Sequence, residues 1–504
     1  MTNQPNILII HADQQRYDSL GCTGNPYVRT PNLDRLASEG TLFTRHISSN
    51  TICMPSRAGL LTGLYPPGHN VWTNGIPLNR REYAHANQQS IGERVCPKPP
   101  TAADIFARGG YDTAAFGKLH LTPNLAPVEY GFHETWACWQ DGRFDDWHGP
   151  YYGFQHVEMT QGHGEQPCYL GHYALWLQQM YPEIYKAVGR NAKEVERPVP
   201  QLNDLYPSAI PAELHNTRWL ADRFSAYLNA RSGERPFFAF VGFPDPHHPF
   251  TPSHDVVREF EGIDVQTSFD ADGEAAAATP LANAGTDVSM LTAEERRIVK
   301  RYTYAMVYQV DQAVGRIIES LKRAGVWEST IVVFTSDHGD FLCDHARLRK
   351  SINASDPLLH LPFVIRAPGA GLPARVDTPM SNVDVLPTLA AMAGVPGPAW
   401  VHGVDMARVV REGEDHVAAN PAGSMSYCSG GEPETVNYTV YDDAYRFTVY
   451  PYTGYTELYD HRDDPGETRN LVDAQPERAA AMRRIIEARL LMHRNPILGR
   501  VSAW

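Results

Sequence analysis

The sequence has no excess of basic residues. It carries 44 lysines and arginines against 58 aspartates and glutamates, which gives a formal net charge of −14 over 504 residues. Binding to a nucleic-acid backbone needs a basic surface, so we exclude a nucleic-acid partner. A negatively charged protein can still bind an anionic substrate where a few cations converge locally.

Long apolar runs and closely spaced cysteine pairs are also missing. No run reaches the roughly 18 apolar residues that a membrane span needs, and no basic leader with a cleavage site precedes the first apolar strand. The seven cysteines form no CxxC pair, and their number is odd. These absences predict a protein with no membrane partner and with reduced cysteines, located in the cytoplasm.

What the sequence does contain is an alternation of short apolar strands and helical patterns. Strands are predicted at Ile7–Ile10, Thr113–Phe116, Phe237–Phe243, Ile331–Thr335 and Phe363–Arg366. Helices are predicted near 31–39, 55–63, 101–109, 211–231, 292–323 and 384–393. The alternation predicts an α/β fold, with a large, mostly parallel sheet flanked by helices.

Three other stretches depart from this alternation. Residues 136–210 and 262–288 show no clear period and are interpreted as insertions rather than core. After about residue 420 the pattern changes to short strands around 436–460 and a helix at about 475–493. We therefore predict a catalytic domain over 1–420 and a C-terminal subdomain over 421–504, with an antiparallel sheet and one helix.

Polar residues follow several of the predicted strands directly. Asp13 follows the first strand, His247 follows the strand at Phe237, and Asp337 follows the strand at Ile331. Ligand sites in sheets of this kind lie beyond the carboxyl ends of the strands. We expect these side chains to converge there.

The strongest local signal is the segment from Cys53 to Gly63. Pro55 suits the first turn of a helix, which places Cys53 at the helix entrance, where free amides favour a developing anion. Arg57 lies four residues further on, on the same face, and can reach back. The alternative for a lone Cys and Pro is a buried structural cysteine before an ordinary helix.

The run Cys53-Met54-Pro55-Ser56-Arg57, continued by Leu60-Leu61-Thr62-Gly63, resembles the signature of the formylglycine-dependent sulfatases, in the alkaline phosphatase superfamily. The resemblance implies an alkaline phosphatase-like fold and oxidation of Cys53 to formylglycine by a formylglycine-generating enzyme or maturase. In that family one hydroxyl of the hydrated aldehyde attacks sulfur, and the second later expels sulfate. A plain thiolate lacks that second hydroxyl.

Further segments resemble the same family. Gly117-Lys118-Leu119-His120 is similar to a family segment whose Lys and His contact the sulfate and the nucleophile. Pro246-His247-His248-Pro249 is similar to a second segment, which makes His247 the catalytic histidine. Lys350 matches a lysine that follows the Asp-His pair of the family. The predicted catalytic residues are Cys53, Arg57, Lys118, His120, His247 and Lys350.

The resemblance also implies a metal site formed by Asp13, Gln14, Asp337 and His338. Carboxylate and amide oxygens suit Ca²⁺ or Mg²⁺, and an imidazole is also accepted by Mn²⁺. We expect one divalent cation, with Ca²⁺ first and Mg²⁺ or Mn²⁺ as alternatives.

Some positions depart from the usual sulfatase pattern. Gln14 stands where many sulfatases have a second Asp, and His338 where many have Asn. Together with Asn74, predicted to contact substrate, this set resembles the phosphonate monoester and phosphodiester hydrolases of the superfamily. Ala354-Ser355 replaces the usual aromatic-acidic pair after Lys350. Lys118 and His120 keep the sulfatase pattern.

The organic part of the substrate is the least constrained feature. Trp139 and Trp147 lie in the 136–210 stretch and either stack on a sugar or fill the core of the insertion. His163 is interpreted as structural. We predict a small sulfated carbohydrate or another polar sulfate ester as the substrate; phosphonate or phosphodiester hydrolysis and a non-catalytic binding role are the alternatives. A homo-oligomer is left open.

Overall fold

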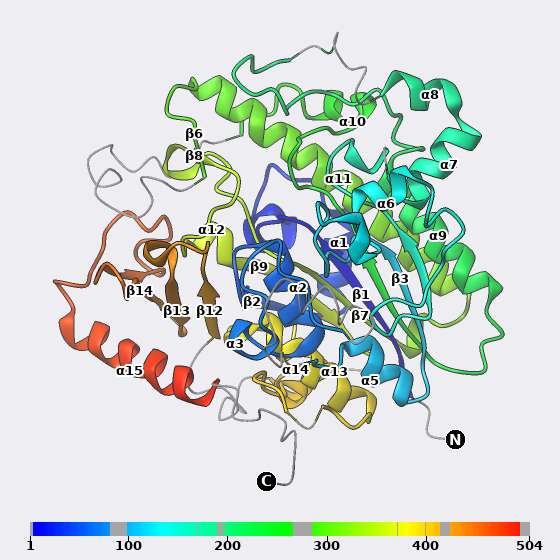
Figure 1. The fold of residues 1–504 in the computed structure, drawn as a ribbon. Helices are drawn as coiled ribbons and strands as arrows, with labels where there is room; N and C mark the ends of the chain where they lie inside the picture. The colour runs from blue at the N-terminus through cyan, green and yellow to red at the C-terminus, as the bar shows by residue number, and fades with distance from the viewer. Residues whose placement is uncertain are drawn as a thin grey trace.

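The computed structural model describes residues 4–80, 98–168, 170–188, 195, 197–265, 285–369, 371–398, 400–413 and 424–493. A large sheet occupies the centre and is enclosed by helices, with a smaller sheet beside it (Figure 1). Within these ranges, no helix combines the length and the apolar character needed to cross a membrane.

The large sheet has the strand order β10-β2-β9-β7-β1-β5-β3-β4, and β11 also pairs with β2. Only β9 runs against its described neighbours; every other pairing is parallel. The predicted mostly parallel α/β sheet is therefore confirmed. The strands are β1 (Asn6–Ala12), β2 (Thr41–Ile47), β3 (Asp112–Gly117), β4 (His156–Met159), β5 (Phe237–Gly242), β7 (Thr330–Ser336), β9 (His360–Arg366), β10 (Arg375–Val376) and β11 (Met380–Ser381).

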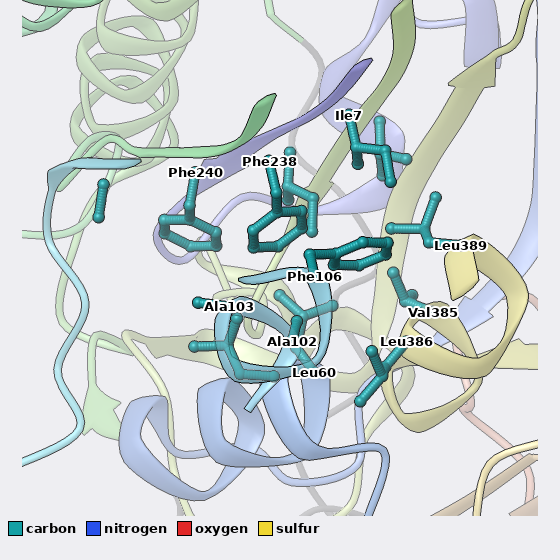
Figure 2. Close-up of a cluster of buried hydrophobic side chains, with 14 of the residues drawn as sticks. Ile7, Leu60, Ala102, Ala103, Phe106, Phe238, Phe240, Val385, Leu386 and Leu389 are labelled. Carbon is teal, nitrogen blue, oxygen red and sulfur yellow. The ribbon is translucent and has the colours of Figure 1, made fainter. Parts of the chain in front are cut away.

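Two helical layers cover the sheet, and alternate residues of β1 face them. Leu8 and Ile10 pack towards α1 (Pro31–Ser38), α9 (Asn216–Ala230) and α11 (Ala293–Arg323). Ile7 and Ile9 pack towards α2 (Cys53–Thr62), α5 (Ala102–Arg108), α13 (Val385–Ala393) and α14 (Ala407–Glu412). Figure 2 shows this second layer, in which Phe106 lies between Phe238 of the sheet and Leu389 of α13. Burial on both faces explains why the strands are almost entirely apolar.

The prediction that residues 136–210 lie outside the core is wrong, because this stretch adds a strand to the sheet and many of its side chains belong to the two main core clusters. β4 extends the large sheet by pairing in parallel with β3. Its four residues, His156-Val157-Glu158-Met159, are too few and too polar to show the apolar run of a central strand. The same stretch also forms α6 (Trp136–Gln140), α7 (His172–Met180) and α8 (Pro182–Ala187). Residues 266–284 of the second predicted insertion lie outside the described ranges.

Smaller elements complete this part of the chain. They are α3 (Pro66–His69), α10 (His254–Val257), α12 (Asp356–Leu359) and the short pair β6 (Thr286–Asp287) and β8 (Arg347–Leu348).

The C-terminal unit, residues 424–493, is an antiparallel sheet with one helix, as predicted. Its strands are β12 (Ser424–Cys428), β13 (Asn437–Tyr441), β14 (Tyr445–Val449) and β15 (Thr456–Asp460), in that order, and its helix is α15 (Pro476–Met492). Phe447 and Leu458 of the sheet pack with Met482 and Ile486 of α15. The predicted boundary at 420/421 lies outside the described residues and stays a prediction.

Candidate active site

Two carboxylates leave the large sheet side by side. β1 and β7 pair in parallel up to Ala12 and Ser336, so the next residue of each strand, Asp13 and Asp337, lies at the same edge. Both side chains are fully buried. Lys118 directly follows β3, and its ammonium group bonds the Asp13 carboxylate. The convergence expected from the strand ends is confirmed for Asp13 and Asp337.

Helix α2 brings Cys53 to this edge as its first residue. Pro55 lies in the first turn, and the Cys53 side chain is buried. The exposed Asn74 lies beside the helix entrance, where its Oδ1 accepts a hydrogen bond of 3.1 Å from the Met54 amide. The helix start therefore presents Cys53 to the carboxylate cluster, with Asn74 next to it.

Arg57 joins the two carboxylates. Its Nε donates to Asp337 Oδ2 at 2.8 Å and its Nη2 donates to Asp13 Oδ2 at 3.0 Å. Its third contact is Nη1 to the Lys118 carbonyl at 2.9 Å. Because its donors are used in this way, Arg57 fixes the spacing of the carboxylates instead of reaching back to Cys53.

Basic and imidazole groups surround the sulfur of Cys53. Lys350 Nζ donates to Cys53 Sγ at 2.7 Å and lies 3.0 Å from His247 Nε2. His338 Nε2 is 3.3 Å from the sulfur, and the His120 imidazole is near enough that Cys53 opposes the lowering of its pKa by burial and by Lys118. The structure holds Cys53 as a thiol, so Sγ stands in for the hydroxyl groups of a hydrated formylglycine.

This environment favours an anion at the Cys53 position. Burial alone raises the pKa of the thiol, but the positive charges of Lys118 and Lys350, together with His338, outweigh it and hold that pKa well below its usual range. Burial, with His163 and Lys350 nearby, holds the pKa of His247 well below its usual range as well. The site thus combines fixed positive charge with a neutral imidazole.

The donor set at this edge fits a divalent cation. Asp13 Oδ1 and Gln14 Oε1 are buried and have no hydrogen-bond partner among the described residues. His338 Nε2 lies 3.6 Å from Asp13 Oδ1 and 3.7 Å from Asp337 Oδ1. Two carboxylates, an amide oxygen and an imidazole nitrogen are ligands that Ca²⁺, Mg²⁺ or Mn²⁺ accepts in combination.

Asp340, which was not predicted as a site residue, orients Gln14. Gln14 Nε2 donates to Asp340 Oδ2 at 2.5 Å and lies 3.2 Å from His248 Nδ1. With the nitrogen of the amide held on that side, the oxygen is the atom left to face the cluster. The Asp340 carboxylate is itself held by the amides of Leu342 and Arg349.

His163 belongs to the cluster, which corrects its interpretation as a structural residue. Its ring stacks on that of His247 with centroids 3.6 Å apart, and its Nε2 contacts Lys118 Nζ. His163 Nε2 is also 3.7 Å from Asp13 Oδ2. The signal was available, because His163 lies in the loop that begins at the carboxyl end of β4, at the same edge of the sheet as Asp13. It was missed because β4 was not recognised as a strand of the sheet.

The described ring contacts of Trp139 and Trp147 are with His133 and with residues of their own stretch. Trp139 is 6% exposed, and its indole nitrogen donates to the His133 carbonyl at 2.7 Å. Trp139 also lines a surface pocket with Asp145 and Tyr185, and none of the cluster residues described above lines that pocket. Trp147 is partly buried, 4.2 Å from the His133 ring. The surroundings of Trp139 do not support its predicted stacking on substrate; for Trp147 that role stays a prediction.

Comparison with known proteins agrees with this geometry. The family model for sulfatases matches residues 5–395, and the model for the C-terminal part of N-sulphoglucosamine sulphohydrolase matches residues 351–495. The chain therefore belongs to the sulfatase family and is a sulfuric ester hydrolase. This membership removes the alternative of a non-catalytic binding protein.

Individual relatives cover almost the whole chain. An arylsulfatase of Clostridium perfringens is 26% identical over 96% of this chain and 94% of its own. A multifunctional alkaline phosphatase superfamily protein of Trinickia caryophylli, PehA, is 30% identical over 81% of this chain and 77% of its own. The crystal structure of a phosphonate monoester hydrolase of Agrobacterium radiobacter is similar with a TM-score of 0.77 and 25% identity, covering 97% and 96% of the two chains.

Proposed function

We propose that this chain hydrolyses sulfate esters with a formylglycine nucleophile made from Cys53 by a maturation enzyme. The observation that carries the proposal is the placement of two ammonium groups around Cys53. Lys350 Nζ contacts the sulfur at 2.7 Å, and Lys118 Nζ bonds the neighbouring Asp13 carboxylate. A compact tetrahedral anion bound at Cys53 would meet positive charge from both lysines, which stabilises negative charge in the transition state.

The residues of the cluster have distinct roles in this proposal. Asp13, Gln14, Asp337 and His338 would hold one divalent cation, Ca²⁺ first, which when bound neutralises sulfate charge and favours ionisation of the nucleophilic hydroxyl. Arg57 holds the two carboxylates at fixed spacing. His120 would donate a hydrogen bond to the sulfate group or to the nucleophile, since its imidazole lies near Cys53.

His247 is proposed as the group that gives a proton to the departing alcohol oxygen. Its Nδ1 lies 2.5 Å from the His248 carbonyl, which fixes the ring, and its Nε2 faces Lys350 and the Cys53 region. In the free site the low pKa keeps His247 neutral, with Nδ1 donating to the His248 carbonyl and Nε2 accepting from Lys350. The negative charge of a bound sulfate ester raises that pKa, and the imidazolium would then carry on Nε2 the proton for the ester oxygen.

The proposed substrate is a small polar sulfate ester, and sulfated carbohydrates are the first class to test. The exposed Asn74 amide beside Cys53 supports a polar leaving group, since it lies at the edge of the buried cluster. The packing of Trp139 removes one argument for a sugar ring that stacks within the insertion. A panel of sulfated monosaccharides and disaccharides, compared with aryl sulfates by kcat/KM, tests this choice.

Hydrolysis of phosphonate monoesters or phosphodiesters is the second candidate. Gln14 and His338 favour it, because this pair resembles the metal ligands of those hydrolases. The similarity to the phosphonate monoester hydrolase of Agrobacterium radiobacter also supports it. Lys118 and His120, which keep the sulfatase pattern, favour the sulfate ester.

Two measurements test the proposal together. Conversion of Cys53 to formylglycine lowers the intact mass by about 18 Da, a covalent change that mass spectrometry resolves. The converted protein should hydrolyse 4-nitrophenyl sulfate with a higher kcat/KM than 4-nitrophenyl phenylphosphonate. A Cys53→Ala preparation, purified in the same way, gives the background from contaminating enzymes. A reversed preference favours the second candidate, and full activity with an unconverted thiol contradicts the formylglycine nucleophile.

A further inference from the structure

We infer that Glu134 is a positioning residue that sets the orientation of His120, an inference that rests on the proposed sulfate-ester hydrolysis. Glu134 lies between β3 and α6 and belongs to no motif recognised in the sequence. Its side chain is 2% exposed. A carboxylate buried to this extent needs hydrogen-bond donors around it, and its donors come from the loop that carries His120.

The Glu134 carboxylate binds three successive backbone amides. One oxygen accepts from the amide of His120, and the other accepts from Leu121 at 2.6 Å and from Thr122 at 2.9 Å. The hydroxyl of Tyr151 donates to that second oxygen at 2.7 Å. Successive amides that enclose an anion form a nest, whose conformation depends on the anion being present.

His120 needs such support because of its backbone conformation. Its φ is +55°, in the left-handed region that residues with a Cβ seldom adopt. In this conformation the amide of His120 donates to Glu134, and its imidazole lies close enough to Cys53 for the two side chains to influence each other's pKa. The carboxylate therefore acts on the nucleophile position through His120, without touching it.

The aromatic insertion supports the same segment. The ring of His133, the residue before Glu134, contacts Trp147 at 4.2 Å and Phe144 at 4.5 Å between centroids. Tyr151, which bonds Glu134 directly, lies 5.4 Å from the same ring. These contacts give the aromatics of the insertion a link to the active site through residues 133 and 134.

The decisive experiment is a double-mutant cycle on the matured enzyme. Glu134→Gln keeps the size of the side chain but places an NH₂ group opposite backbone N–H donors. We expect kcat to fall by about 10- to 100-fold, because small misplacement of a reacting group has effects of that order, with KM changed less than about threefold. In a His120→Ala background the same substitution should have almost no further effect, since its target is gone.

A matched control separates positioning from general stability. Glu158 is a second buried carboxylate, 3% exposed, and its described hydrogen bond goes to Arg223 at 2.6 Å rather than to the amides of residues 120–122. Glu158→Gln should lower the melting temperature as much as Glu134→Gln does, yet leave kcat within about twofold of the wild type. Equal losses of kcat in Glu134→Gln with and without His120 would overturn the inference.

A second readout distinguishes failure of the inference from failure of the proposed function. If matured wild-type protein hydrolyses no sulfate ester, the proposed function fails, and the rate of alkylation of the Cys53 thiol by iodoacetamide in the unmatured chain still tests Glu134. Glu134→Gln and His120→Ala should change this rate by the same factor, and the double variant should add nothing. A wild-type alkylation rate in Glu134→Gln alone would show that Glu134 does not act on His120.

Discussion

The carboxyl edge of the large sheet and the C-terminal unit both bury ionisable side chains, but they treat them differently. In the C-terminal unit, Arg446 is 1% exposed and donates to Glu467 at 2.8 Å and to Glu457 at 3.1 Å. Glu467 also accepts from the Asp356 amide at 3.1 Å and contacts His461 at 2.8 Å. The charges of this network are satisfied by one another.

At the edge of the large sheet, the ion pairs do not satisfy every buried polar atom. Arg57 and Lys118 pair with Asp13 and Asp337, yet Asp13 Oδ1 and the Gln14 amide oxygen keep no hydrogen-bond partner among the described residues. The network around Arg446 is closed by its own charges. At the sheet edge the two open oxygens converge with a second carboxylate and an imidazole, and this combination, rather than an unsatisfied atom alone, fits a cation site.

The largest effect is expected from replacement of the nucleophile. Cys53→Ala should lower kcat/KM for 4-nitrophenyl sulfate by about 10⁴-fold or more, since removal of a catalytic nucleophile has that effect in other hydrolases, with little change in the melting temperature. Cys168→Ala, at another buried free cysteine, is the control and should keep its activity. Substantial multiple turnover by Cys53→Ala would contradict the mechanism.

Removing a proposed metal ligand tests whether the open atoms bind a cation. Asp13→Asn should reduce bound metal, measured by elemental analysis, at least about tenfold and cost several kcal/mol of transition-state stabilisation. Asp384→Asn, at a buried carboxylate that caps residues 381–384, should keep its metal. Full metal content in Asp13→Asn would show that Asp13 is not a ligand of the cation.

Substitutions in the Arg446 network should lower the stability of the fold and leave catalysis unchanged. Arg446→Met leaves Glu467 and Glu457 buried without their cation and should lower the free energy of unfolding by about 3–5 kcal/mol, with kcat/KM of the folded protein unchanged. Arg446→Lys, which keeps the charge, should lose less. Arg35→Met breaks an exposed pair with Glu39 and should leave the midpoint of urea denaturation almost unchanged, because solvent screens such a pair. A fall in kcat/KM of Arg446→Met would show that the two networks are coupled.

His69, the last residue of α3, should make stability depend on pH. Burial, with His402 nearby, lowers the pKa of His69 to about 3 from an ordinary value of 6.5. The folded state keeps this imidazole neutral, so only the unfolded chain takes up its proton below pH 6.5. The contribution of His69 to stability therefore falls as the pH drops from 6.5 towards 3, by up to about 1.4 kcal/mol per pH unit, and is flat above 6.5.

His69→Asn isolates this contribution. His69 Nδ1 accepts from the Val71 amide at 3.0 Å, a bond that an Asn side chain can keep without titrating. Urea unfolding of the two proteins between pH 7.5 and 4.5 should give curves that converge or cross as the pH falls, because only the wild type loses the His69 contribution. Parallel curves would exclude His69 as a source of acid sensitivity.

Much of the fold could be predicted because apolar periodicity is a local property. The runs that became β1, β5 and β7 are apolar on both faces, and the helices between them have their own period. β2 and β4 were not predicted as strands. β2 contains Thr44, Arg45 and His46 among its apolar residues, and β4 has only four residues. Neighbouring strands, rather than their own sequences, determine that these segments join the sheet.

By itself, the sequence determined the parallel sheet, the helix entrance at Cys53 and the placement of Asp13 and Asp337 at strand ends. Only the tertiary structure decided which atoms meet: that Arg57 joins the carboxylates, that His163 stacks on His247, and that Glu134 binds the amides behind His120. The physical reason is that periodicity and strand ends are set by residues a few positions apart. Hydrogen-bond partners of a buried side chain depend instead on which distant segments pack against it.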